Sequence, residues 1–183
     1  MTSTAEQITA AALSAFYRQG FHATGVDQLS AAAGVTKRTL YRHFPGKDEL
    51  IDAALRRRDA EFIARLRTRL AAEPAPARPL AYLSFLEEWG RSDGFYGCAF
   101  INAAAEYAGH DARPHQLARA HKLRVLAALT EACGEAGLAE PAQAARALFV
   151  IGEGVIVAMQ VLGAADTPLA EARAAAARAL QLG

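Results

Sequence analysis

The segment from residue 36 to residue 47 carries side chains that suit the recognition of DNA. Lys37, Arg38 and Arg42 lie close together in the sequence. Lys and Arg side chains donate hydrogen bonds to guanine O6 and N7, a contact that distinguishes one base pair from another. If the segment is helical, with about 100° between successive residues, the basic side chains share one arc while Leu40 and Phe44 share another. Such a helix can pack through its apolar side and read base edges with its basic side.

The same region contains groups that suit phosphate oxygens. Threonine and tyrosine hydroxyls, and amides at a helix N-terminus, donate to phosphates and fix the orientation of a protein on the duplex. Lys47 is favoured further because it would begin the next helix, whose N-terminus attracts anions. The sequence therefore predicts base contacts from Lys37, Arg38 and Arg42 and phosphate contacts from Thr24, Thr36, Tyr41, His43 and Lys47, with Thr39 completing the predicted DNA-binding set.

Three short helices are expected to position these side chains. Thr4 followed by Gln7 fits a capping box that begins a first helix, and Gly20 ends it. A second helix fits residues 25–33 and a third fits residues 36–43, with a glycine turn between them. Two short helices joined in this way form a helix-turn-helix, whose second helix enters the major groove. On spacing alone, a plain helical hairpin with solvated lysines is the alternative.

The composition favours an all-α protein with only local basic character. The 183 residues include 45 alanines against 7 prolines and 14 glycines, and alanine has the highest helix propensity while being depleted in strands. The chain carries 20 Lys and Arg against 19 Asp and Glu, so general electrostatic coating of nucleic acid is not supported. Residues 1–58 hold the basic excess, with eight Lys and Arg against five Asp and Glu.

Beyond residue 46 the apolar spacing remains helical. Helices are expected over residues 47 to about 73, about 82–89, 97–108, and about 117–136, followed by an eighth that begins at Glu140 and Pro141 and a ninth that Pro168 opens at its first position. The sequence therefore predicts an all-α fold of about nine helices.

The segment from residue 24 to residue 50 resembles the DNA-binding signature of TetR-family transcriptional regulators. The resemblance is carried by Thr24-Gly25-Val26-Asp27-Gln28-Leu29, by Gly34-Val35-Thr36-Lys37-Arg38-Thr39-Leu40-Tyr41-Arg42-His43-Phe44, and by Lys47-Asp48-Glu49-Leu50. Matched by position, Thr24, Tyr41, His43 and Lys47 correspond to backbone contacts of the family, whereas Lys37, Arg38 and Arg42 correspond to variable positions that set operator choice. Gly25 and Gly46 depart from the family pattern, which frequently has a second hydroxyl residue and a polar cap there.

The resemblance implies an architecture for the whole chain. In that family the three N-terminal helices bind DNA, the C-terminal helices form a ligand pocket, and the last two helices pair into a dimeric four-helix bundle. The implied domains are a helix-turn-helix DNA-binding domain over residues 1–46 and a ligand-binding and dimerisation domain over residues 47–183. The expected protein is a regulator that acts as a repressor, binds a palindromic operator as a homodimer and is released by a small-molecule effector. A helical interaction protein that does not bind DNA is the alternative class.

The eighth expected helix supplies apolar surface for such a dimer. The residues expected to contribute are Phe149, Val150, Val157, Met159, Val161 and Leu162, with Gly152, Gly154 and Gly163 permitting close approach. An aspartate in place of Ile156 is expected to break the dimer. Glu153, within this apolar helix, needs a partner.

Residues 89–107 combine aromatic and polar side chains, a composition typical of small-ligand pockets. The candidate ligand contacts, between the fifth and eighth helices, are Trp89, Cys98, Phe100, Asn102, Glu106, Tyr107 and Met159. For each aromatic side chain an ordinary core position is the alternative. A buried Glu106 near the pocket would favour a cationic or hydroxyl-bearing ligand, because an unpaired buried carboxylate is costly.

Cys98 supports a second hypothesis for the response. A thiol near a helix N-terminus can become a reactive thiolate, which would make the protein a redox or electrophile sensor. A small buried hydrophobe is the alternative for this residue. Cys133 lies on an apolar stripe and is expected to be structural.

Enzymatic and metal-binding motifs are absent from the sequence. There is no GxSxG, GxxxxGK[ST] or HExxH, so neither an enzyme nor a cofactor is expected. His110, His115 and His121 are five and six residues apart rather than three or four, so we expect surface histidines and no metal site.

The most apolar stretch, residues 147–165, is nearly long enough to span a bilayer. Glu153 and Gln160 interrupt it, and a helix that is apolar all round also occurs in the core of soluble proteins. With no signal-peptide pattern and only two cysteines, the expected protein is cytoplasmic and has no membrane partner.

Overall fold

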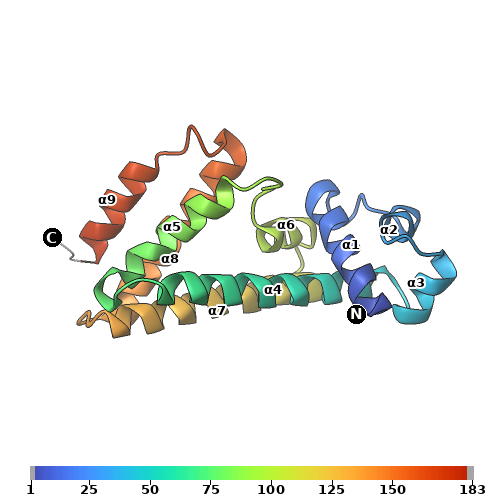
Figure 1. Cartoon of the computed structure of the whole chain (residues 1–183), viewed down its shortest axis with the longest axis horizontal. Helices are drawn as coiled ribbons and strands as arrows, with labels where there is room; N and C mark the ends of the chain where they lie inside the picture. The colour runs from blue at the N-terminus through green and yellow to red at the C-terminus, as the bar shows by residue number, and fades with distance from the viewer. Residues whose placement is uncertain (1–2, 181–183) are drawn as a thin grey trace. The chain divides into compact units, whose positions relative to one another are not determined.

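The structure is a computed structural model that describes residues 3–180 of the chain. Over that range it contains nine α-helices and a short 3-10 helix, η1, with no strand (Figure 1). The helices are α1 (Thr4–Gln19), α2 (Val26–Ala32), α3 (Lys37–His43), α4 (Lys47–Ala71), η1 (Ala75–Ala77), α5 (Arg78–Gly90), α6 (Ala99–Glu106), α7 (Arg113–Glu135), α8 (Pro141–Leu162) and α9 (Leu169–Ala179). The expected all-α fold is confirmed.

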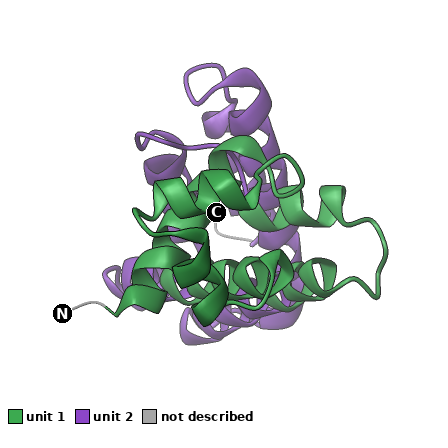
Figure 2. Cartoon of the chain, turned by 90° about the vertical axis from the view of Figure 1, so that its right-hand side faces the viewer, with its two compact units in different colours: residues 1–61, 99–121 green, residues 62–98, 122–183 purple. Residues whose placement is uncertain are grey.

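The chain divides into two compact units, which Figure 2 distinguishes by colour. The first unit is Met1–Glu61 with Ala99–His121, and the second is Phe62–Cys98 with Lys122–Gly183. Helices α4 and α7 therefore contribute residues to both units. The predicted boundary at residue 46 separates a DNA-binding domain from a ligand-binding and dimerisation domain. The division into compact units does not test this boundary, which stays a prediction.

The core of the first unit holds its short helices in place. Ile8 and Phe16 of α1, Leu29 of α2 and Leu40 of α3 are all at most 1% exposed. The ring of Phe16 stacks on that of Phe21, with 5.3 Å between the centroids. Because isolated helices this short are unstable in water, α2 and α3 depend on this shared core for their helical state.

In the second unit, α5, α8 and α9 pack against one another. Tyr82 of α5 is fully buried. Two glycines lie at contacts between α5 and α8. A Cβ at Gly152 of α8 would lie 2.3 Å from the ring of Tyr82, and a Cβ at Gly90 of α5 would lie 2.2 Å from Sδ of Met159. A Cβ at Gly152 would therefore force the fully buried Tyr82 ring to move, whereas one at Gly90 would require only a shift of the flexible end of Met159.

Several helix boundaries differ slightly from the predicted ones. The capping box of α1 is formed by Ser3 and Glu6 rather than by Thr4 and Gln7, with the amide of Glu6 donating to Oγ of Ser3 at 3.2 Å. Two capping boxes overlap in this sequence, and the preceding residue supplies the cap. Pro168 is the N-cap of α9 and not its first helical residue.

Helix α8 is long and apolar enough to cross a membrane by length and composition alone. One face of it, which includes Leu148, Val155 and Ile156, is buried inside the second unit. Another face leaves Val150 and Val161 exposed. The expectation of a buried helix therefore holds for only part of its circumference.

Candidate DNA-binding site

A tight turn joins α2 to α3. Gly34 occupies it with φ of +65°, in the left-handed region that favours glycine. The amide of Val35 donates to the carbonyl of Ser30 at 3.0 Å, which closes the C-terminus of α2. At the other end of α2, the amide of Gly25 donates to Oε1 of Gln28 at 2.8 Å. Local hydrogen bonds therefore define both ends of α2.

Helix α3 is capped at its start and divided into a buried and an exposed face. Oγ1 of Thr36 accepts a hydrogen bond from the amide of Thr39 at 3.1 Å. Leu40 is buried against the first unit's core, whereas Tyr41 is 47% exposed. Arg38 and Arg42 are also exposed. The predicted separation of an apolar face from a polar, basic face is confirmed.

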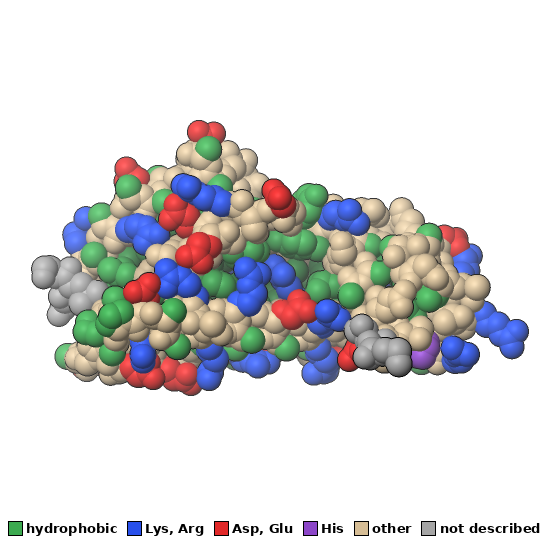
Figure 3. All heavy atoms as spheres, in the orientation of Figure 1, with side chains coloured by type: hydrophobic (Ala, Val, Ile, Leu, Met, Phe, Trp, Pro, Cys, Tyr) green, Lys and Arg blue, Asp and Glu red, His purple; other side chains and the backbone are tan. Residues whose placement is uncertain are grey.

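The basic side chains of α3 differ in what they contact. Arg38 and Arg42 make no ion pair within the described residues. Lys37 forms an ion pair with Asp27 of α2, although both side chains are more than half exposed, so this pair contributes little to stability. Figure 3 shows Lys and Arg side chains on the surface of the first unit around α3. Two free guanidinium groups and one exchangeable ammonium group are therefore available to a ligand.

Four of the residues predicted to contact phosphates are at least partly accessible to solvent. Thr36, Tyr41 and part of the Lys47 side chain are solvent-accessible, and Nζ of Lys47 donates to the carbonyl of His22 at 3.1 Å. His43 is half-buried, and its Nε2 has no partner among the described residues.

Thr24 is the exception among the predicted contacts. It is fully buried, and its hydroxyl donates to the carbonyl of Gly20 at 2.6 Å. A hydroxyl that is buried and already donating cannot reach a phosphate in this conformation. We therefore assign Thr24 a structural role in the turn between α1 and α2 and leave it out of the DNA contacts.

The turn between α1 and α2 is held by a residue that the sequence analysis placed in a ligand pocket. The carboxylate of Glu106, at the end of α6, accepts hydrogen bonds from the amides of Phe21 at 2.9 Å and His22 at 2.7 Å. The ring of His22 lies 4.5 Å from that of Tyr107, centroid to centroid. Glu106 thus has two backbone partners and needs no cationic ligand, which corrects the expectation based on an unpaired carboxylate.

The other predicted ligand contacts are distributed over both units. Phe100, Asn102, Glu106 and Tyr107 belong to the first unit, and Trp89, Cys98 and Met159 belong to the second. The ring of Phe100 stacks on that of His121 with 3.7 Å between centroids. Burial raises the pKa of Tyr107, and the nearby carboxylates of Asp48 and Glu106 raise it further.

A polar cluster in the second unit joins residues from four segments. Nζ of Lys122 on α7 donates to Oε1 of Glu153 on α8 at 2.8 Å and to Sγ of Cys98 at 3.5 Å. The hydroxyl of Tyr82 is buried and has no hydrogen-bond partner among the described residues. Burial raises the pKa of Tyr82 well above its usual value, and Glu153 and Cys98 add to this.

The sequence analysis missed most of this cluster. It identified Cys98 and recognised that Glu153 needs a partner, and the partner is Lys122 of the same chain. Nothing in the spacing of Tyr82 and Lys122 points to the cluster, because the two residues are 40 positions apart and meet only through packing. Trp89 of α5 and Met159 of α8 are both buried in the second unit. The side chain of Met159 faces Gly90, the residue that follows Trp89.

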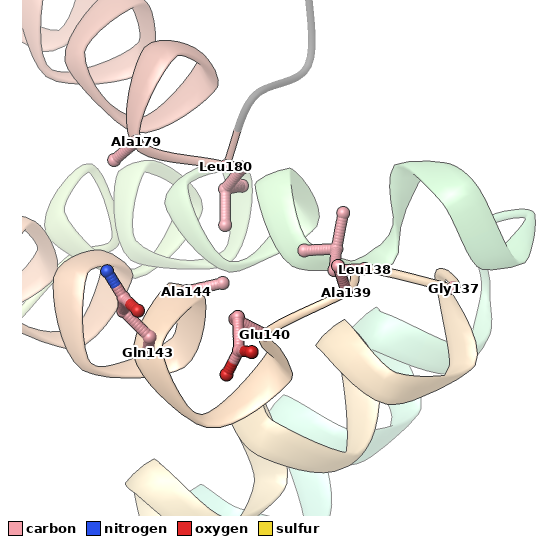
Figure 4. Close-up of a pocket in the computed structure, with 8 residues that line it drawn as sticks. All are labelled: Gly137, Leu138, Ala139, Glu140, Gln143, Ala144, Ala179 and Leu180. Carbon is pink, nitrogen blue, oxygen red and sulfur yellow. The ribbon is translucent and has the colours of Figure 1, made fainter.

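Two hollows in the structure are lined by residues other than those of this cluster. One, of about 240 Å³, is formed by the turn between α7 and α8 together with the end of α9 (Figure 4). None of its lining residues was predicted to bind a ligand. The other, of about 550 Å³, is in the first unit and is lined by Asp48, Glu49, Asp52, Tyr107, Ala112, Arg113 and Pro114. Of the predicted ligand contacts only Tyr107 lines it.

Cys133 differs from Cys98 in its surroundings. It is fully buried, and this burial raises the pKa of its thiol to about 11. The thiolate is therefore scarce at neutral pH, as expected for a structural cysteine.

Known proteins resemble this chain at two levels. The family described as "Bacterial regulatory proteins, tetR family" matches residues 8–54. The HTH-type transcriptional activator FasR of Mycolicibacterium smegmatis is 39% identical over 64 residues, which are 35% of this chain and 29% of that protein. The HTH-type transcriptional regulator TcmR of Streptomyces glaucescens is 36% identical over 81 residues, 44% of this chain and 34% of that protein. The matched segments thus span about a third of these two relatives.

A solved structure extends the similarity to almost the whole chain. A TetR-family transcriptional regulator from Streptomyces coelicolor is 31% identical, with a TM-score of 0.89, over 98% of this chain and 96% of that one. The chain therefore belongs to the TetR family of transcriptional regulators. Members of this family are transcription factors and not enzymes, which agrees with the lack of enzymatic motifs in the sequence.

The role of Glu106 gives a testable prediction about the first unit. Replacing Glu106 with alanine leaves the amides of Phe21 and His22 without their acceptor, and a part-buried donor without a partner costs about 1–3 kcal/mol. We expect faster hydrogen exchange at these two amides and a lower free energy of unfolding. Glu131→Ala, which removes only an exposed pair with Arg67, is the matched control and should change little. Unchanged exchange in Glu106→Ala would contradict this role.

Proposed function

We propose that this TetR-family protein binds operator DNA through α2 and α3, in the cytoplasm, and represses transcription until a small molecule releases it. The observation that supports this most directly is the division of α3, where Leu40 is buried and Arg38 and Arg42 are exposed without ion pairs. In a helix-turn-helix the second helix lies in the major groove with such side chains directed to base edges.

The contacts separate by role. Arg38 and Arg42 bind base edges, and Lys37 joins them once it exchanges Asp27 for a guanine. Thr36, Thr39, Tyr41, His43 and Lys47 bind the phosphate backbone and hold the register of α3 on the duplex. Lys47 is at the N-terminus of α4, where the helix dipole adds to its attraction for a phosphate.

This division of roles predicts two kinds of DNA-binding defect. Arg38→Ala should relax the preference at one operator position and cost about 1–3 kcal/mol there. Lys47→Ala should weaken binding to all sequences and reduce the slope of affinity against salt. Binding site selection from random duplexes, followed by affinity measurements at several salt concentrations, tests both. Arg67→Ala, which removes an equal charge from the second unit, serves as the control. Equal losses on every sequence from both variants would show that the roles are assigned wrongly.

A dimer that presents two such helices to a palindromic operator is supported by one face of α8. Val150, Gly154, Val157 and Val161 follow the i, i+4, i+7 and i+11 spacing of a helical stripe, and Val150 and Val161 are 68% and 74% exposed. A contiguous apolar stripe on the surface is typical of an interface. We propose that α8 and α9 form this interface and that the two reading helices bind successive major grooves, about one helical turn apart.

Two residues of the predicted dimer surface, Gly152 and Met159, are not on the surface, and neither is Ile156, the proposed site of the aspartate substitution. Ile156 and Met159 are each 2% exposed, and Gly152 is packed against Tyr82. These three belong to the core of the second unit and not to its surface. An aspartate at Ile156 would therefore disturb the monomer itself, so that it cannot serve as a test of the dimer.

An aspartate on the exposed stripe is the sharper test. Val161→Asp places a charge in the proposed interface and should produce monomers in sedimentation while the fold of each chain is kept. Operator binding should fall with it, because one half-site alone loses the second set of contacts. Leu123→Asp, at an exposed apolar position on α7, is the control and should stay dimeric. A monomeric wild-type protein at micromolar concentration would contradict the dimer.

The second unit supplies the features of an effector site. Tyr82 is protonated at neutral pH, as tyrosines ordinarily are, and burial raises its pKa further; its buried hydroxyl has no hydrogen-bond partner among the described residues. Leaving a buried donor unpaired costs about 1–3 kcal/mol, which a ligand acceptor would recover. We propose that a largely apolar effector with one acceptor group binds beside Tyr82, with Trp89 and Met159 as apolar contacts. The effector favours a conformation of the dimer in which the spacing of the two α3 helices does not match the operator, and this lowers the affinity for DNA.

One observation favours a second candidate, a thiol-based sensor. The ammonium group of Lys122 lies 3.5 Å from Sγ of Cys98, and a cationic neighbour is a feature of reactive cysteines. In this version hydrogen peroxide transfers one oxygen atom to the Cys98 thiolate, which becomes a sulfenic acid while the peroxide is reduced to water. The low exposure of Cys98, 3%, places this candidate second.

Cys98→Ser separates the two candidates. We expect the variant to bind operator normally and to be released by the same apolar compounds as the wild type, with or without reductant. Hydrogen peroxide should release neither the wild type nor Cys98→Ser from DNA. Cys133→Ser, which removes the other cysteine, is the control and should behave like the wild type. Release by peroxide that is reversed by reductant and lost in Cys98→Ser would instead establish the sensor and remove the apolar effector as the main signal.

A further inference from the structure

Two histidines meet at the loop between α6 and α7 in the first unit. Nδ1 of His110 lies 3.0 Å from Nε2 of His115, and the ring centroids are 4.5 Å apart at an angle of 77°. His110 is exposed and precedes α7, whereas His115 lies in the first turn of that helix. The spacing of five residues would separate them on one helix, but the loop brings His110 back over the helix. The structure thus pairs side chains that the spacing rule had separated.

A backbone contact fixes the proton on His115. Its Nδ1 lies 3.1 Å from the carbonyl oxygen of Tyr107. A carbonyl oxygen only accepts, so Nδ1 carries the hydrogen, and in the neutral ring Nε2 keeps a lone pair. That lone pair faces Nδ1 of His110. Histidines that bind metals are oriented in this way, with one ring nitrogen donating to a backbone carbonyl and the other directed at the ion.

The distance between the two nitrogens fits a shared metal ion after a small adjustment. Zn–N bonds of about 2.0–2.1 Å at a tetrahedral angle place two nitrogens about 3.4 Å apart. The pair must therefore open by a few tenths of an ångström, and each ring must turn so that both lone pairs meet at the ion. The proton between the rings must leave Nδ1 of His110, and the neutral His110 ring can carry it on Nε2 instead, where solvent can accept it because this side chain is exposed.

We propose that His110 and His115 bind one divalent transition-metal ion through Nδ1 and Nε2, respectively. No group of three or more His, Cys, Asp and Glu in the described residues could hold a metal, so water completes the coordination. Two imidazoles select ions of the Zn²⁺, Ni²⁺ and Cu²⁺ class, with Cu²⁺ the most strongly bound. Oxygen-preferring ions such as Mg²⁺ are excluded by the same ligand set.

The site is joined to the turn between α1 and α2 through residues of the same unit. His115 holds the carbonyl of Tyr107, whose ring lies against His22, and the adjacent Glu106 accepts from the amides of Phe21 and His22. An ion that fixes His115 therefore stabilises the end of α6 at the point where it supports this turn. Metal binding by this pair requires neither DNA nor an effector.

Titration of the untagged protein with Zn²⁺ and Cu²⁺ tests the site. Calorimetry with Zn²⁺ should give one ion per chain, and electron paramagnetic resonance with one equivalent of Cu²⁺ should show two coordinated nitrogens. Zn²⁺ should also raise the melting temperature, because an ion that binds only the folded state stabilises it. Mg²⁺ should do neither.

Two conservative variants remove one metal-facing nitrogen each. His115→Asn can keep a donor for the Tyr107 carbonyl but lacks Nε2, and His110→Gln lacks Nδ1 in an exposed loop. Each should weaken Zn²⁺ binding by about tenfold or more, and the double variant should lose less than the sum of the two single losses, because both rings hold one ion. His43→Ala, which removes a histidine outside the pair, is the control and should bind Zn²⁺ with the affinity of the wild type.

Three results would overturn the proposal. These are Zn²⁺ affinity that is unchanged in both single variants, loss of the two-nitrogen Cu²⁺ signal in His43→Ala, and independent additive losses with more than one ion per chain. Melting curves without metal check that the variants are folded. A variant with a lowered metal-free melting temperature is replaced by His110→Ala, which alters only the exposed loop.

Discussion

A helix of seven residues is unstable on its own in water, and α3 is such a helix. Its helical state depends on the burial of Leu40 in the core shared with α1 and α2 and on the cap that Thr36 provides. Everything that α3 presents outward inherits its position from these two contacts. The exposed guanidinium groups are therefore pre-oriented by an apolar anchor on the opposite side of one short helix, and the loss of conformational freedom has been met before any ligand arrives.

The same dependence on distant support holds for the turn that precedes α2. Phe21 and His22 present amides that their own neighbours in sequence do not satisfy, and a carboxylate from the end of α6 accepts both. The second unit solves a similar problem for the charge on α8. Glu153 would be costly in an apolar helix, and Lys122 of α7 neutralises it. In both cases one ionisable side chain joins elements that no local signal connects.

Local signals account for what could be predicted from the sequence. The glycine turn at Gly34, the cap at Thr36 and the two faces of α3 depend on residues three or four positions apart, so the pattern contains them. Contacts such as that of Glu106 with Phe21, 85 residues away, depend on the packed fold and leave no periodic trace. Thr24 illustrates the limit within the motif itself, because a residue type that suits phosphates is equally suited to close a turn.

Helix α8 shows another limit of sequence patterns. Because it is apolar nearly all round, its composition does not reveal which side faces the core. A rotation of the helix by one residue would bury Val157, which is exposed, in place of Ile156, which is buried. The family resemblance supplied the class of protein but not this rotation. His110 and His115 were separated by the rule for ligands on one helix, which does not apply when one of the two lies in a loop.

The glycines between α5 and α8 have a mechanical consequence. At Gly152 the ring of Tyr82 rests on bare backbone, and Gly90 receives Met159 in the same way. Side chains normally act as a compressible layer that absorbs small displacements by changing rotamer. At Gly152 no side chain of α8 lies between the Tyr82 ring and the helix backbone, so a displacement of the ring meets the α8 backbone directly. Val150 and Val161 are on the same helix as Gly152, so the contact with Tyr82 links the buried core of the second unit to the exposed valine stripe.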